Sequence, residues 1–135
     1  MELQKILYTY LLTVPVFFAI DMLWLGIIAR GFYAKQLASF LSPNVNWTAG
    51  IIFYLLYIVG IIYFAVLPGV EKKSLALVVM NAALFGGLAY ATYDLTNLAT
   101  LKNWPLQIVL VDIAWGVVLT SLVAMASYSI AQWLR

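Results

Sequence analysis

The sequence predicts an all-α membrane protein, folded as a compact antiparallel bundle of four transmembrane helices with a short interfacial helix between helices 1 and 2. Of its 135 residues, 66% are hydrophobic and 9% are charged, whereas soluble domains have roughly 45–50% apolar and about 25% charged residues. Four apolar stretches reach the roughly 20 residues that a membrane-spanning helix needs. The charged residues gather mainly at the ends of these stretches.

The four expected spans have recognisable boundaries, and together they make residues 1–135 a single integral membrane domain. Arg30 and Gly31 follow the first span, Pro68 and Gly69 end the second, and Pro105 opens the fourth at a position favoured in a first helical turn. The first apolar run is too long for a signal-peptide core and lacks a small-residue cleavage pattern, so we expect the mature protein to keep it. The predicted spans are residues 6–29, 47–67, 74–98 and 105–131.

The connection between the first two spans, residues 30–46, is the only long one. Its apolar residues have helical spacing, which predicts a short helix lying on the membrane and ended by Pro43. These residues are Phe32, Tyr33, Leu37, Phe40 and Leu41. The other two connections are short, so consecutive spans are expected to be antiparallel neighbours.

Basic residues are slightly more numerous on the side of the membrane that holds the termini. That side has Lys5, Lys72, Lys73 and Arg135, and the opposite side has Arg30, Lys35 and Lys102. Since cytoplasmic segments carry an excess of Lys and Arg, this margin predicts that both termini are cytoplasmic. A reversed bundle is the alternative.

Three aspartates lie inside the predicted spans at one depth. Asp21, Asp94 and Asp112 belong to the first, third and fourth spans, and a rise of 1.5 Å per residue places each roughly 6 to 12 Å inside the face opposite the termini. Asp94 shares a helical stripe with small residues, so it is predicted to face the bundle interior. The pattern D-x-x-W occurs twice, as Asp21/Trp24 and Asp112/Trp115, which puts each carboxylate one turn from an indole N–H that can donate to it.

Further polar side chains are expected at about the same depth, where they complete a pocket under one membrane face. They are Tyr54, Tyr57, Thr92, Tyr93, Thr96 and Asn97. A single buried Asp is often only a packing hydrogen bond, but three ionised ones repel one another and each costs about 2.5 to 3.5 kcal/mol at a helix centre. We therefore expect protons, a cation or a basic substrate to compensate them. Because the chain has no Cys or His, neither a metal site nor a cofactor is predicted.

Four strings in the chain carry a resemblance that covers nearly its whole length. They are F-F-A-I-D-M-L-W-L-G (17–26), F-Y-L-L-Y (53–57), Y-A-T-Y-D-L-T-N-L-A-T (90–100) and D-I-A-W-G (112–116). The sequence resembles a bacterial family of predicted membrane proteins, domain-of-unknown-function family 2177. The resemblance implies a multi-pass protein of the bacterial inner (cytoplasmic) membrane with four spans, and it implies no particular activity.

Three functions are compatible with this pattern. The first is binding or transport of a small cation, a proton-coupled solute or another small molecule by the Asp, Trp and Tyr side chains. Since four spans are few for a pore, transport would favour a homodimer. The second is a membrane enzyme acting on a lipid or isoprenoid with an Asp as general acid or base. The third is an accessory subunit whose Asp side chains bond to a partner helix. The lipid bilayer is the expected environment, and a net charge of +2 is too small for a nucleic-acid partner.

Overall fold

A computed structural model describes all 135 residues, and every regular element in it is helical. In chain order the elements are α1 (Leu3–Leu23), η1 (Trp24–Ile28), α2 (Arg30–Gln36), α3 (Trp47–Ile61), η2 (Ile62–Val66), α4 (Leu67–Lys72), α5 (Leu75–Thr100) and α6 (Leu106–Trp133). Four continuous runs are long and apolar enough to cross a membrane, namely Leu3–Ile28, Trp47–Lys72, Leu75–Thr100 and Leu106–Trp133. The predicted all-α class with four candidate transmembrane helices is confirmed.

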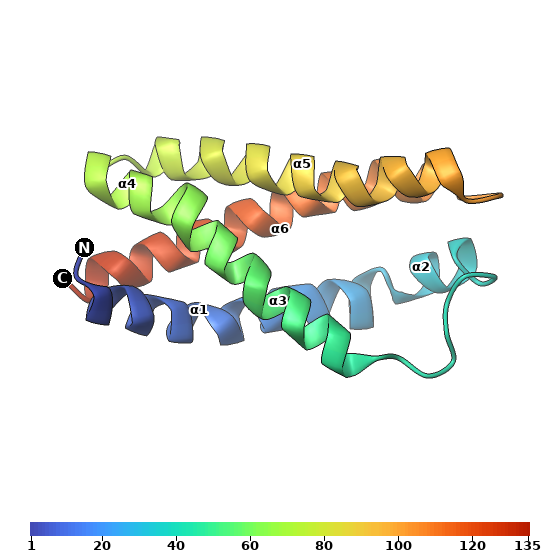
Figure 1. Cartoon of the computed structure of the whole chain (residues 1–135), viewed down its shortest axis with the longest axis horizontal. Coiled ribbons are helices and arrows are strands. Elements are labelled where there is room, and N and C mark those ends of the chain that lie inside the picture. Colours follow the sequence, from blue (N-terminus) through green and yellow to red (C-terminus); the bar gives the residue numbers. More distant parts are fainter.

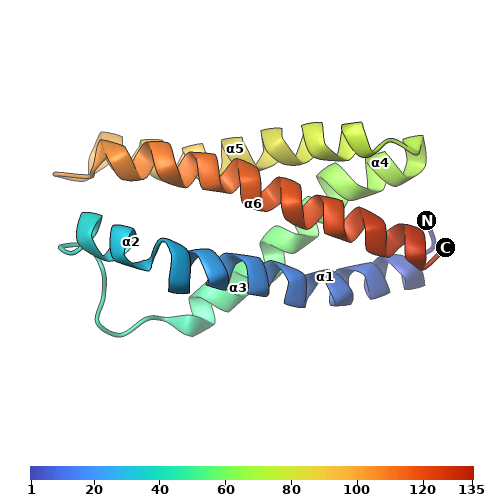
Figure 2. The ribbon, with the colours of Figure 1, turned by 180° about the vertical axis from the view of Figure 1, so that it is seen from behind.

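The long helices lie along one axis, with both termini at the same end (Figure 1). Helices α1, α5 and α6 run close to this axis, whereas α3 crosses it obliquely and points from α4, near the termini, toward the opposite end without reaching it. Figure 2 shows from behind that α6 lies between α5 and α1. Because α3 is inclined, it diverges from α5 toward the end opposite the termini.

The connection after the first span contains a helix, but this helix is shorter than the sequence predicted. Helix α2 ends at Gln36, so Phe40 lies in the following turn and Leu41 lies after it, and neither extends the apolar face of the helix. In both views α2 continues in nearly the same direction as α1 (Figures 1 and 2). The buried Leu37 packs in a small cluster with Trp104 and the start of α6, which holds α2 against that helix.

The sequence predicted that the second span ends at Pro68, but the helix continues past this residue. The helix widens into a π turn at Ile62–Val66, and the N–H of Leu67 then bonds to the carbonyl of Ile62. Pro68 stands in the first turn after this π turn, where its missing N–H removes no hydrogen bond from a regular α-helix. Helix α4 therefore continues to Lys72. The chain reverses at Lys73, whose φ of 53° is left-handed, and Ser74 caps the next helix.

Helices α5 and α6 pack in very close contact through glycines. A Cβ added to Gly86 would lie 2.4 Å from the Gly116 carbonyl oxygen and 2.5 Å from the Thr120 hydroxyl, and a Cβ added to Gly116 would lie 2.3 Å from the Tyr90 ring. Only glycine permits this separation, as in other membrane helix pairs with small residues at the interface. The first contact joins Gly86 to Thr120, and the next joins Tyr90 to Gly116. Between them the position moves forward four residues on α5 and back four residues on α6.

The apolar core occupies the half of the molecule nearer the termini. Its fully buried members include Phe17 of α1, Ile58 and Ile61 of α3, Val78 of α5 and Val123 of α6. The other half of the bundle contains the three aspartates. The fold therefore separates a close-packed apolar half from a half that holds ionisable groups.

Candidate ligand-binding site

Asp21, Asp94 and Asp112 come from three different helices and lie at a common depth. They are seven residues before Ile28, six before Thr100 and six after Leu106, the span ends on that side, which corresponds to about 9 to 11 Å from those ends. Their side chains are only 2%, 0% and 8% exposed, respectively. All three carboxyl groups are therefore inside the bundle, as the helical stripes predicted for Asp94.

Asp94 and Asp112 form a pair because of the register between α5 and α6. One more step of four residues beyond the contact of Tyr90 with Gly116 places Asp94 opposite Asp112. Both Asp94 oxygens are buried, and neither has a donor within hydrogen-bonding geometry. A buried carboxyl group without a donor costs free energy, and Asp94 is the only buried carboxyl group of the molecule in this state.

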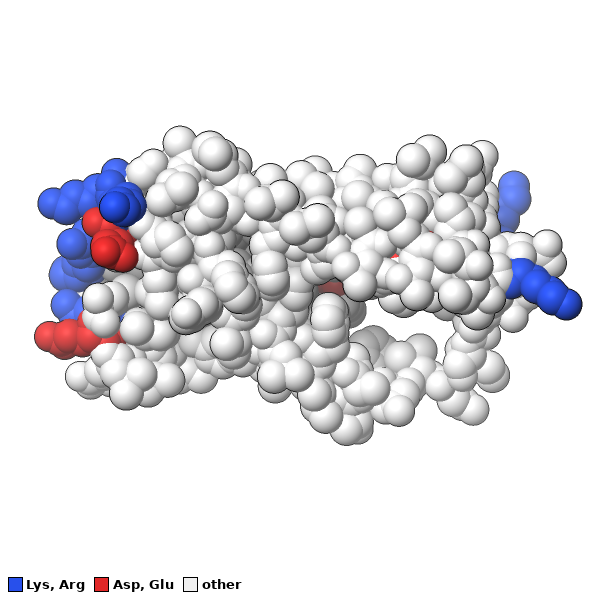
Figure 3. Space-filling model, turned by 45° about the horizontal axis from the view of Figure 1, so that its top comes forward, with Lys and Arg blue, Asp and Glu red and all other residues white.

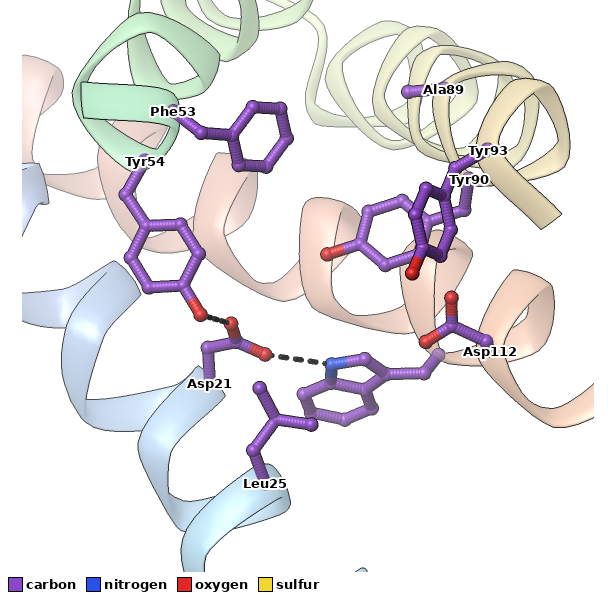
Figure 4. Close-up of a pocket in the computed structure, with 9 residues that line it drawn as sticks. Asp21, Leu25, Phe53, Tyr54, Ala89, Tyr90, Tyr93 and Asp112 are labelled. Carbon is purple, nitrogen blue, oxygen red and sulfur yellow. Dashed lines mark hydrogen bonds between the residues drawn. The ribbon is translucent and has the colours of Figure 1, made fainter. Parts of the chain in front are cut away.

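Asp21, in contrast, is well provided with donors. The Tyr54 hydroxyl of α3 donates to its Oδ2, and the Trp115 indole of α6 donates to its Oδ1 at 3.0 Å (Figure 4). These bonds connect three helices through one carboxylate. Each oxygen of the Asp21 carboxyl group thus has a donor from another helix, unlike the oxygens of Asp94.

A second chain of hydrogen bonds reaches Asp112 from the connection after the first span. The Tyr33 hydroxyl donates to Asp112 Oδ1 at 2.7 Å, and the Trp24 indole N–H lies 3.2 Å from the Tyr33 oxygen. Burial raises the pKa of Tyr33, which lies outside the spans, above its ordinary value of 10.0, so this phenol keeps its proton at neutral pH. Tyr33 thus links α2 to the site.

The two D-x-x-W patterns are used differently from the prediction. Neither indole donates to the aspartate of its own helix. Trp115 donates to Asp21 across the helix interface, and Trp24 reaches Asp112 only through Tyr33. The two indoles stack on each other with ring centroids 4.5 Å apart and planes 10° apart. The π turn that begins at Trp24 follows Asp21 within one turn, and such turns are frequent at functional sites.

A cavity of about 490 Å³ opens beside these groups. It is lined by Asp21 and Leu25 of the first span, Phe53 and Tyr54 of α3, Ala89, Tyr90 and Tyr93 of α5, and Asp112 and Trp115 of α6. Figure 4 shows the hydroxyls of Tyr90 and Tyr93 directed toward the space between the helices, with the Asp21 and Asp112 carboxyl groups on its floor. The result is an aromatic pocket with two acidic groups.

Only some of the residues predicted for the site line the cavity. Asp21, Asp112, Tyr54, Tyr93 and Trp115 line the cavity. Trp24 stacks on Trp115 from outside the lining, and Asp94 is buried on α5 opposite Asp112. Tyr57 is buried in the core and hydrogen-bonds Thr120 at 2.7 Å. Thr92 and Thr96 are exposed, and Asn97 is half-buried but does not line the cavity.

Five participants were missed by the sequence reasoning. They are Leu25, Tyr33, Phe53, Ala89 and Tyr90. Tyr90 precedes Asp94 by four residues on the same helix, so the helical stripe that contains Asp94 could have found it. Tyr33 had no such signal, because its role depends on how α2 packs against the start of α6.

The bundle and its buried carboxyl groups define a multi-spanning integral membrane protein with an internal acidic pocket. A family described as "Predicted membrane protein (DUF2177)" matches residues 6–129, and the chain belongs to this family. No curated protein and no solved structure matches the chain.

Proposed function

We propose that the protein binds an organic monocation in this pocket, in exchange for a proton, and acts as a transporter or a transporter-like receptor. The observation that supports this function best is the uncompensated acidity of the pocket. Three buried carboxyl groups lie at one depth inside the bundle, while all seven Lys and Arg residues lie near the ends of the spans or in the connections. An ionisable group inside a membrane protein indicates a functional site when no structural partner neutralises it.

The lining favours an organic cation over a metal ion. No group of three or more Asp, Glu, His or Cys side chains is arranged to hold a metal. The cavity instead presents the rings of Tyr54, Tyr90 and Trp115, and the faces of Tyr and Trp attract ammonium groups. A volume of about 490 Å³ also lies within the roughly 300–1,000 Å³ typical of small-molecule sites.

The pair of Asp94 and Asp112 is the group that we propose to hold and release the exchanged proton. Two adjacent buried carboxyl groups disfavour double ionisation, so the empty pair holds a proton. An arriving ammonium group favours the ionised form of both and releases that proton. The coupling would let a proton gradient drive the movement of the cation, or let pH control its binding.

Calorimetric titration of the purified protein with butylammonium tests the proposal. Asp112→Asn should weaken binding by about tenfold or more, because a carboxylate next to a buried cation is lost. Glu71→Gln is the matched control, since it also removes one carboxylate but lies at the far end, exposed beside α5. Absence of butylammonium binding, or an equal effect of both variants, would overturn the proposed function.

A membrane enzyme is the second candidate, supported by the same carboxyl pair. Adjacent acids can divide the roles of general acid and general base, and a lipid or isoprenoid would be the substrate. Lipid extracts of cells with wild-type protein or Asp94→Asn, compared by mass spectrometry, separate the two. A lipid species that depends on Asp94 would favour the enzyme, and identical extracts would remove it.

The side of the membrane is also proposed. The basic residues favour cytoplasmic termini in a bacterial inner membrane, so the pocket would lie in the outer half of the bilayer. The chain lacks cysteine, which makes single-cysteine labelling clean. Lys102→Cys should react with a membrane-impermeant thiol reagent in cells with a permeabilised outer membrane, and Lys73→Cys should not. The reverse pattern would invert the orientation.

A further inference from the structure

The pocket has an opening on the side of the bundle, between α3 and α5. These helices meet where Gly60 faces Phe85, since a Cβ on Gly60 would lie 2.6 Å from the Phe85 ring. From this crossing α3 diverges from α5 toward the end opposite the termini (Figure 1). Phe53 on α3 and Tyr93 on α5 line the cavity from the two sides of the gap, and they are 49% and 55% exposed.

The opening faces the region that lipid chains occupy around the bundle. Phe53 lies six residues inside its span, as Asp94 and Asp112 do, which corresponds to about 9 Å from the span end. Figure 3 shows a hollow in the side of the molecule between the two ends that carry Lys and Arg, with acidic side-chain atoms visible inside. A ligand that enters here comes from the bilayer.

The two ends of the pocket therefore have different chemistry. Its floor has the carboxyl groups of Asp21 and Asp112, and the remaining lining is Leu25, Phe53, Ala89 and aromatic rings. A short water-soluble cation would use only the floor. A ligand with an ammonium head and an alkyl chain would satisfy both parts, with its head on the carboxyl groups and its chain between α3 and α5.

We infer that the ligand is a long-chain amphipathic amine, which reaches the carboxyl groups laterally from the bilayer between α3 and α5. This inference rests on the proposed cation site and adds the substrate class and the route of entry. It also assigns a function to the oblique course of α3, which keeps α3 and α5 apart at the depth of the aspartates.

Photolabelling of the wild-type protein in nanodiscs tests the inference. The probe is dodecylamine with a diazirine in the middle of its chain, and the labelled peptides are mapped by mass spectrometry. We expect labels concentrated on α3 around Phe53 and on α5 around Tyr93, and we expect excess unlabelled dodecylamine to remove them. Labels spread evenly over the lipid-facing surfaces of all helices, or labels insensitive to the competitor, would overturn the lateral route.

Butylammonium binding, measured in parallel, separates this inference from the proposed function. Binding of butylammonium without labels between α3 and α5 would leave the cation site standing and refute the lateral ligand. Loss of both results would refute both. Competed labels together with butylammonium binding support the amphipathic amine, and competed labels without butylammonium binding would refute the cation site and the amphipathic amine with it.

A pair of tryptophan variants tests the opening itself. Ala89→Trp places an indole in the cavity lining, and Ala99→Trp makes the same change at an exposed position near the end of α5. We expect the first to reduce competed labelling about tenfold or more and the second to leave it unchanged. Equal labelling in both variants would contradict entry between α3 and α5. The wild-type experiment decides the inference even if Ala89→Trp does not fold.

Discussion

Replacing Asp94 by Asn should make the protein more stable while it removes its function. Both Asp94 oxygens are fully buried and lack a donor, and the register of α5 against α6 places Asp94 opposite Asp112. Asn has nearly the same shape, carries no charge and brings an N–H₂ group that can donate to Asp112. If Asp94 were only a packing strut, its replacement would instead lower stability.

The expected size of the gain follows from the cost of an unsatisfied buried polar group. That cost is about 1–3 kcal/mol in protein mutational data, so Asp94→Asn should raise the free energy of unfolding by up to this amount at a pH high enough to remove the proton that the ligand-free pair shares. Functional residues often lower stability, and their replacement then stabilises the fold at the expense of activity. The same variant should lose the proton released by the cation.

Asp21→Asn is the matched control, because Asp21 accepts hydrogen bonds from Tyr54 and Trp115. The amide has one acceptor oxygen in place of two, so the two donors no longer each have an acceptor, which should lower stability by about 1 kcal/mol, near the range measured in other membrane proteins. Equilibrium unfolding in mixed detergent micelles measures both variants. A loss of more than about 1 kcal/mol for Asp94→Asn, with unchanged butylammonium binding, would refute the reasoning.

Two further variants test the packing around the site. Gly116→Ala should destabilise the fold by about 1–3 kcal/mol, because its new Cβ would collide with Tyr90 at 2.3 Å. Gly50→Ala is the control, since its Cβ meets nothing within 4 Å and should have no comparable effect. Thermal unfolding compares the two variants, and equal melting temperatures would contradict the packing of α5 on α6. Tyr33→Phe should expose α2 to faster amide hydrogen exchange, because it removes the hydrogen bond to Asp112, and unchanged exchange would show that α2 is held by other contacts.

The sequence predicts the spans and the depth of the aspartates well, for simple physical reasons. A membrane-spanning helix must be long and apolar, and its rise per residue fixes the depth of every side chain. Asp21, Asp94 and Asp112 were therefore found from hydropathy and counting alone. The burial of Asp94 also followed from the small residues on its stripe.

The partners of these aspartates depend on how the helices pack, which one sequence does not contain. Trp115 follows Asp112 of its own helix by one turn, but it donates to Asp21 of a helix about ninety residues away in the chain. The register that pairs Asp94 with Asp112 depends on close glycine contacts between α5 and α6. Pro68 misled the prediction because a π turn before it allows the helix to continue.

Proton release on cation binding tests the central claim most directly. Butylammonium is added to the purified protein in weakly buffered solution, and the change in pH is measured against the amount bound. We expect about one proton released per cation bound by the wild-type protein, and none by Asp94→Asn. Cation binding without proton release, or equal release by both proteins, would contradict a proton-exchanging carboxyl pair.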